Sequence, residues 1–184
     1  MLYEFLGAQP KVNESNFIAP SADIIGDVEL GEESSVWFNC TIRGDVNSIR
    51  IGSRSNVQDN TCIHVTNQTH PTNIGNQVTI GHSAMIHGCT IKDRVLIGIQ
   101  TILLDGAVVE SDCIVAAGSL VAPGKVMPSG WMCMGRPAKP VRKLTDEEIA
   151  SIVQYSDNYV KYSRAYMQLD KYDKNPFYSP EKSG

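Results

Sequence analysis

An aliphatic residue recurs at every sixth position through most of the chain. Seven consecutive positions in the second half of the sequence follow this step: Ile91, Ile97, Leu103, Val109, Val115, Val121 and Met127. The same step runs through residues 18–42, 51–63 and 74–86, and only the three joins between these runs break the phase. Because a helix needs apolar spacing near 3.6 and an alternating strand needs a spacing of two, neither element alone explains the pattern.

Small or β-branched residues usually occupy the fourth position after the aliphatic one, as at Ala22, Cys40 and Thr61. Short strands joined by tight turns account for both features. Three hexads close one triangular coil, their aliphatic side chains stack inside it, and each coil pairs with the next as a parallel β-helix. The sequence therefore predicts an all-β solenoid of hexapeptide repeats over residues 1–140.

The sequence changes character after this solenoid. Pro137 and Pro140 are expected to end strand pairing, since proline has no N–H to donate. A capping box at Thr145 and Glu148 and a stripe of residues at helical spacing then predict a helix from about 146 to 169. The second unit, residues 141–184, is this helix, packed on the flank of the solenoid or on a neighbouring subunit, with an extended tail from residue 171.

The composition is that of an ordinary globular protein. The 184 residues are 42% hydrophobic and 20% charged, which leaves room for one main domain and a short appendage. Sixteen Lys and Arg against twenty Asp and Glu give a net charge of -4, and no run of basic residues exceeds two. We therefore expect neither a nucleic-acid partner nor a membrane-surface partner.

The N-terminal segment and the cysteines indicate the compartment in which the protein works. The first fifteen residues show no cationic region followed by an apolar stretch, and no window of about 18 apolar residues appears, which predicts a cytoplasmic protein. The five cysteines are 20 or more residues apart, so they form neither a metal pair nor a disulfide framework. We expect them to be small buried residues.

Three of the four histidines fall within 24 residues of one another. If the sides of each coil are lettered A, B and C in rotation from Ile18, and each join counts as one side, then His64 and His87 each follow a side-B aliphatic residue. They should stack in adjacent coils, about 4.8 Å apart. His82 falls on side A, so a neighbouring subunit must supply it. Packing side A of one chain against side B of the next around a threefold axis predicts a homotrimer with three equivalent sites.

Three imidazoles leave one position of a bound metal open. This arrangement is typical of catalytic Zn²⁺ sites, in which bound water becomes a nucleophile at neutral pH. Fe²⁺ and Co²⁺ accept the same ligands. Arg43 should lie one coil below His64 on side B, and Gln58 and Asp59 one coil below His82 on side A, so these side chains would line the same interface.

The chain resembles the γ-class carbonic anhydrase family, including its carbonic-anhydrase-like hexapeptide proteins, along nearly its whole length. The resemblance rests on these motifs: Arg43-Gly44-Asp45, Asn56-Val57-Gln58-Asp59-Asn60-Thr61, Ile63-His64, Ile80-Gly81-His82 with His87, and Gly135-Arg136-Pro137-Ala138-Lys139. It implies a left-handed β-helix, a hand that the sequence pattern alone does not give, since crossovers are normally right-handed. It also implies reversible hydration of CO2 to bicarbonate, with the metal held by His64 and His87 of one subunit and His82 of the next.

The resemblance further implies roles for four neighbouring residues. Arg43 and Asp59 would form an ion pair between subunits, Asp45 would support the site, and Gln58 would orient the metal-bound hydroxide. An ion pair that only holds the trimer together is an equally good interpretation of Arg43 and Asp59, since buried pairs need not add net stability.

Proton transfer is where the chain departs from the family. The best-characterised members carry glutamates in the loop between the first and second ligands, whereas residues 66–73 contain no carboxylate. We therefore expect a low turnover, with His70 as the candidate proton shuttle because imidazole titrates near neutral pH. Tyr159 of the predicted helix is a further candidate that could reach the site from outside.

Two other functions fit parts of the pattern. Hexapeptide acyltransferases use one histidine between subunits as a general base, and His64 or His87 could serve in that way. That chemistry needs fewer histidines than are in phase here, and no long loop for CoA is evident. Alternatively, the metal site could stabilise a catalytically silent scaffold or assembly protein, because a fold does not determine a function.

Overall fold

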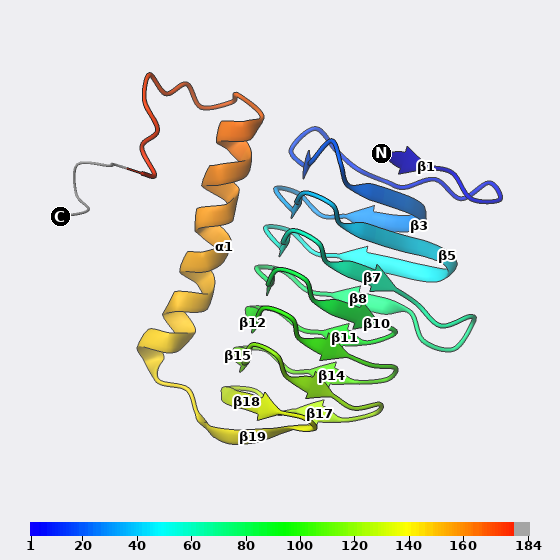
Figure 1. Cartoon of the computed structure of the whole chain (residues 1–184), viewed down its shortest axis with the longest axis vertical. Coiled ribbons are helices and arrows are strands. Elements are labelled where there is room, and N and C mark those ends of the chain that lie inside the picture. The colour runs from blue at the N-terminus through cyan, green and yellow to red at the C-terminus, as the bar shows by residue number, and fades with distance from the viewer. Residues whose placement is uncertain (179–184) are drawn as a thin grey trace.

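The computed structural model describes residues 1–178, and in this part the chain forms a left-handed parallel β-helix of about seven turns with one helix along its side (Figure 1). The fold class predicted from the period of six is confirmed. Side A is a sheet of eight strands: β2 (Phe17–Ile18), β4 (Ser35–Val36), β6 (Asn56–Val57), β9 (Thr79–Ile80), β12 (Val95–Ile97), β15 (Cys113–Val115), β18 (Trp131–Gly135) and β19 (Ala138–Lys143).

Sides B and C are joined into one sheet of eleven strands, because β3 (Asp23–Leu30) and β5 (Thr41–Ile51) bend around the corner between them. The remaining strands of side B are β1 (Leu2–Tyr3), β7 (Cys62–His64), β10 (Met85–His87), β13 (Ile102–Leu103) and β16 (Leu120–Val121). Those of side C are β8 (Thr72–Ile74), β11 (Thr90–Ile91), β14 (Val108–Val109) and β17 (Val126–Met127).

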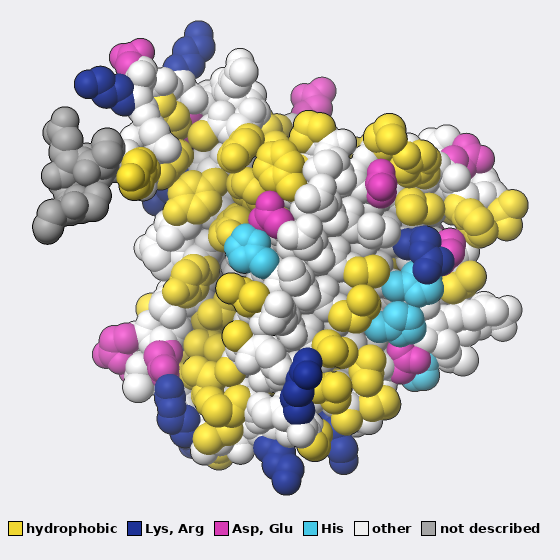
Figure 2. Space-filling model, viewed as in Figure 1, with side chains coloured by type: hydrophobic (Ala, Val, Ile, Leu, Met, Phe, Trp, Pro, Cys, Tyr) yellow, Lys and Arg dark blue, Asp and Glu magenta, His cyan; other side chains and the backbone are white. Residues whose placement is uncertain are grey.

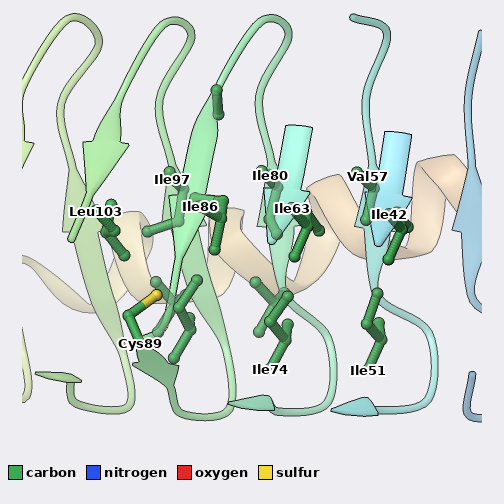
Figure 3. Close-up of a cluster of buried hydrophobic side chains, with 14 of the residues drawn as sticks. Ile42, Ile51, Val57, Ile63, Ile74, Ile80, Ile86, Cys89, Ile97 and Leu103 are labelled. Atoms are coloured by element: carbon green, nitrogen blue, oxygen red, sulfur yellow. The ribbon is translucent and has the colours of Figure 1, made fainter. Parts of the chain in front are cut away.

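The aliphatic positions stack coil upon coil inside the prism. On side B, Ile42 pairs with Ile63, Ile63 with Ile86, and Ile86 with Leu103. All four are completely buried and form one row of the core (Figure 3). The three joins that break the sequence phase all fall at the corner between sides B and C, so the side assignment made from the sequence is confirmed.

The cysteines are free thiols, as predicted, and four of them are buried, whereas Cys62 is partly exposed. Burial raises the pKa of Cys40 to about 11 and that of Cys89 to about 12. At neutral pH these thiols are therefore protonated and behave as small apolar side chains.

The end of the solenoid differs from the prediction. β19 folds back antiparallel to β18, and Pro140 lies within it opposite Cys133. The expectation that the prolines end strand pairing was therefore wrong. β19 is the last strand of its sheet, where a residue without an N–H is tolerated. The sheet consequently runs to Lys143, three residues past the expected boundary.

The C-terminal helix α1 (Asp146–Tyr166) begins at the predicted capping box, with Thr145 as N-cap and Glu148 reaching back to its backbone. It ends three residues earlier than predicted, because Gln168 takes a positive φ of 57° beyond the C-cap. The helix lies along its own solenoid, against β2, β4 and β9 of side A (Figure 1).

Polar contacts fix α1 in place. The Ser156 hydroxyl donates to the carbonyl of Arg54 at 2.6 Å, and Asp157 accepts from the Arg54 guanidinium at 2.8 Å.

The tail after the helix was expected to be extended, but over residues 171–178 it turns back and places the ring of Phe177 4.9 Å from that of Tyr162. Among the residues described, no helix has a run of apolar residues long enough to cross a membrane.

Candidate metal centre

Two histidines stack on side B. His64 ends β7 and His87 ends β10, and the two residues pair directly in the parallel register. Their ring centroids are 5.2 Å apart, and Nδ1 of His64 lies 3.2 Å from Nε2 of His87. The prediction that these two side chains stack in adjacent coils is confirmed.

Each of these imidazoles also contacts a carboxylate through its other nitrogen. His64 Nε2 lies 3.0 Å from Asp45 Oδ1, and His87 Nδ1 lies 2.6 Å from Asp105 Oδ1. Partial burial acts to raise the pKa of Asp45, but hydrogen bonds from His64 and Arg43 hold it below its ordinary value. The Thr66 hydroxyl, with a smaller contribution from His87, lowers the pKa of Asp105. Both carboxylates are therefore ionised at neutral pH, and in a hydrogen bond they can only be acceptors.

These contacts with the carboxylates decide which nitrogen of each imidazole faces the other ring. Because the Asp45 and Asp105 carboxylates each accept an N–H from the outer nitrogen of one imidazole, Nδ1 of His64 and Nε2 of His87 are left facing one another as the two nitrogens that a metal could take. Two imidazole nitrogens 3.2 Å apart can share a proton or bind one metal ion between them. Two nitrogen ligands at about 2.0–2.1 Å from a tetrahedral Zn²⁺ lie roughly 3.3 Å apart, so the spacing fits a divalent metal.

Arg43 and Asp45 lie beside this pair. Both belong to β5, one coil below His64, and their side chains form an ion pair within the chain. The pairing of Arg43 with Asp59 that the family resemblance implies is not made within this chain, since Asp59 lies at the end of side A. It remains a prediction about neighbouring copies.

The third histidine lies elsewhere. His82 follows β9 at the corner between sides A and B, and its Nδ1 contacts Asp59 Oδ2 at 2.9 Å. This leaves Nε2 directed away from the carboxylate. Figure 2 shows histidine side chains grouped together at one edge of this face and another set apart from them. Within residues 1–178, no group of three or more His, Cys, Asp or Glu side chains is arranged to hold a metal ion.

Two further predicted residues lie near Asp59, the partner of His82. Gln58 is buried, and its amide donates to Asn56 Oδ1 at 3.2 Å. Tyr159 packs edge-on against Trp37, with ring centroids 5.1 Å apart, and lines a hollow of about 330 Å³ together with Asp59. Burial, reinforced by the negative charge of Asp59, raises the pKa of Tyr159 to about 12, so its phenol is a hydrogen-bond donor at neutral pH. A catalytic role for either residue remains a prediction.

His70 lies in the loop between β7 and β8. Its Nδ1 is 3.0 Å from the Thr69 hydroxyl, and its backbone pairs with Thr66. The structure places His70 beside Asp105 rather than beside the facing nitrogens of His64 and His87. The proposed shuttle is thus connected to the centre through a carboxylate that the sequence analysis did not identify.

Asp105 is the main residue that sequence reasoning missed. It follows Leu103, which stacks on Ile86, so it comes from the coil directly above His87. Extending the same count of sides by one coil would have placed a carboxylate near His87. Thr66, which donates to Asp105 Oδ2 at 2.6 Å, had no such signal, because the loop that carries it interrupts the period.

Comparisons with known proteins identify the family of the chain. The chain is 50% identical over 162 residues to gamma carbonic anhydrase 1, mitochondrial, of Arabidopsis thaliana, and this match covers 85% of the chain and 59% of the plant protein. It is 40% identical over 171 residues to a carbonic anhydrase of Geobacillus kaustophilus, which covers 93% of both chains. The chain thus spans less than two thirds of the plant relative and nearly all of the bacterial one.

A solved structure gives the same fold. A hexapeptide transferase family protein from Anaplasma phagocytophilum superposes with a TM-score of 0.86 at 42% sequence identity, covering 90% of this chain and 97% of that one. No protein-family model matches the chain. The solved protein therefore shares the coil geometry of this chain as well as much of its sequence.

Proposed function

The chain belongs to the γ-class carbonic anhydrase family of hexapeptide-repeat proteins, and from that premise we propose that it catalyses the reversible hydration of CO2 to bicarbonate at a divalent metal. The observation that carries the proposal is the pair of facing nitrogens of His64 and His87, 3.2 Å apart, with the other nitrogen of each ring on a carboxylate. This spacing matches that of two nitrogen ligands on one tetrahedral metal.

Three imidazoles would hold the metal. His64 would ligate through Nδ1 and His87 through Nε2, and the third ligand would be Nε2 of His82 from a neighbouring copy in a homotrimer. Zn²⁺ is our first choice, and Fe²⁺ or Co²⁺ suit the same ligands. When bound, such a metal supplies the Lewis acidity that makes water a nucleophile at neutral pH.

The chain's own residues would prepare the site for CO2. Asp45 and Asp59 hold the imidazoles of His64 and His82 at fixed orientations. Gln58 is held by Asn56 and lies one coil below His82, where its amide would orient the attacking water. The Tyr159 phenol stays protonated and would donate to a polar group in the hollow beside Asp59.

Arg43 would act at the boundary between copies. Its guanidinium is partly exposed on side B and pairs with Asp45 in the single chain. When side A of a neighbour packs there, Arg43 would also pair with that copy's Asp59. The ion pair would then fix the distance between the two halves of the site.

Proton release would limit the rate. The loop between the first two ligands contains no Asp or Glu, so His70 is its only group that titrates near neutral pH. We therefore expect slower turnover than in relatives with an acidic loop, limited by the proton rather than by attack on CO2. A location in the cytoplasm, expected from the sequence, is part of the same proposal.

The test is a CO2 hydration assay on protein purified anaerobically and reconstituted with one metal at a time. We expect activity above the free-metal background, with an imidazole-type buffer raising kcat to a plateau while kcat/KM stays constant. His70→Ala should deepen the buffer dependence if His70 is the shuttle. Full metal occupancy without hydration would contradict the proposal and favour a metal-bound scaffold.

A further inference from the structure

The carboxylate of Asp105 is held at both of its oxygens. Oδ1 lies 2.6 Å from Nδ1 of His87, and Oδ2 accepts from the Thr66 hydroxyl at 2.6 Å. Ionised carboxylates only accept, so the first contact requires a proton on Nδ1 of His87. Nε2, the atom that faces His64, is then the nitrogen left to bind a metal.

Asp105 reaches His87 because the coils stack closely at the corner between sides B and C. Leu103 lies directly above Ile86, and the Gly106 N–H donates to the Gly88 carbonyl at 2.8 Å. The carboxylate therefore comes from the backbone of the adjacent coil. The stacked coils set the position of its backbone, and the Thr66 hydroxyl acts on its side chain.

The loop between β7 and β8 completes the arrangement. Thr66 and His70 pair through their backbones, with N···O distances of 3.0 and 3.4 Å, so the turn between them is closed. The loop packs onto Gly88, whose φ is +54°, and a Cβ at that position would lie 2.8 Å from Cβ of His70. A glycine at this corner thus allows the loop to lie flat and to present the Thr66 hydroxyl to Asp105.

We propose that Asp105 is a positioning residue that fixes His87 in the Nδ1–H tautomer, and that the loop carrying Thr66 and His70 serves to hold this carboxylate. The part of the inference that concerns metal affinity rests on the proposed function, whereas the tautomer does not. The family resemblance implies that an acidic loop moves protons in the best-characterised members. In this chain the corresponding segment would also set the orientation of a ligand.

The first measurement is ¹⁵N NMR of the metal-free protein labelled at histidine, with His87 assigned from a His87→Gln variant. Wild-type His87 should show protonated Nδ1 and unprotonated Nε2 at neutral pH. Asp105→Ala removes the acceptor, so His87 should shift toward the Nε2–H tautomer that free imidazole favours. Asp27→Ala is the matched control, since Asp27 is a carboxylate at the same corner that pairs with Arg50 in a coil below the histidines.

Two further variants guard against misfolding of Asp105→Ala. Thr66→Val removes the hydroxyl at nearly constant volume and should shift the tautomer partly, and Thr66→Ser should restore it. If His87 keeps the wild-type tautomer in both Asp105→Ala and Thr66→Val, the inference is wrong.

The second measurement is the affinity for Zn²⁺ alone, by competition with a chelator. Removing a carboxylate that orients a metal-ligating histidine typically weakens binding by about 10–100-fold, and we expect this for Asp105→Ala with no change for Asp27→Ala. If the wild-type protein binds no metal, the proposed function fails while the tautomer experiment still decides the role of Asp105. Equal Zn²⁺ affinity in wild-type and Asp105→Ala protein would overturn the positioning role.

Discussion

Sides A and B of the prism carry unequal halves of the candidate centre. Side B presents two imidazoles in register, His64 and His87, with 19% and 30% of their side chains exposed. Side A presents one, His82, which is 42% exposed and contacts a single carboxylate. Folding of a single chain therefore orders the two imidazoles of side B. Side A contributes one imidazole, and under the proposed function a neighbouring copy would supply the other ligands.

Under the proposed function, this difference would couple assembly to metal binding. A two-nitrogen site binds divalent metal weakly, and a third imidazole from another copy would both strengthen binding and stabilise the contact. By linkage, a metal that prefers the assembled state must favour assembly by the same factor. Metal affinity should thus depend on protein concentration.

The largest effect should come from mixing variants of the two halves. His64→Ala and His82→Ala should each abolish binding of one metal per chain when assembled alone. Co-assembled as mixed trimers, they should regain part of it, because some interfaces then join an intact side B to an intact side A. The measurement is metal content of trimers carrying two different affinity tags.

His70→Ala is the control for this experiment, since the structure places His70 away from the facing nitrogens, and it should retain full metal content. Confirmed mixed trimers with no recovered metal would mean that the site lies within one chain.

The next largest effect should come from a charge placed on side B. Met85 precedes Ile86 on β10 and is 41% exposed, whereas Val126 holds the equivalent position on side C and is 56% exposed. Met85→Glu should leave a folded monomer with weak metal binding, because an unpaired charge at a closed interface costs several kcal/mol. Light scattering measures the mass and circular dichroism checks the fold.

Val126→Glu is the matched control and should remain trimeric. If it dissociates and Met85→Glu does not, then side C rather than side B forms the contact between copies.

A smaller effect on metal affinity should distinguish the carboxylates of Asp45 and Asp59. Asp45 contacts both His64 and Arg43, and Asp59 contacts His82 alone in the single chain. Asp45→Ala and Asp59→Ala should each weaken Zn²⁺ binding within the range of about 10–100-fold, with the loss larger for Asp45. Titration against a chelator gives both values. An equal loss of Zn²⁺ affinity in the two variants would show that Asp45 and Asp59 orient their imidazoles equally well after assembly.

The smallest effect should come from Tyr159→Phe, which keeps the ring against Trp37 and removes only the hydroxyl. Loss of one neutral hydrogen bond is worth about 1 kcal/mol, so kcat/KM should fall by no more than about fivefold. Because burial raises the pKa of Tyr159 to about 12, its ionisation should add no inflection to the rate profile below roughly pH 11. An inflection near neutral pH that disappears in Tyr159→Phe would contradict this account.

The positions of the histidines could be predicted from the sequence because the coil repeats them. Every sixth residue stacks on its counterpart, so the side on which His64, His82 or His87 lies follows from counting, provided that each irregular join is taken as one corner. The register of β7 with β10 bears this out. The period of six thus predicts on which side of the prism each strand residue lies.

Corners are less predictable for a physical reason. The direction of Asp105 depends on the turn after Leu103 and on the loop that carries Thr66, and neither follows the period of six. Pro140 was misjudged because β19 turns back antiparallel at the edge, where pairing rules for the stacked interior no longer apply. The left-handed coil likewise came from the family resemblance, because the spacing of apolar residues is the same for either hand.

The irregular joins have a consequence for how such a protein can change. The chain gains three residues at one B–C corner, gains five at the next and loses one at the third, yet the strands on all three sides stay in register. Insertions there are absorbed locally, since each coil contacts only its neighbours. Loops of different length and chemistry can therefore be exchanged at this edge in evolution or by design, changing the surroundings of His64 and His87 while the strands that carry them stay in register.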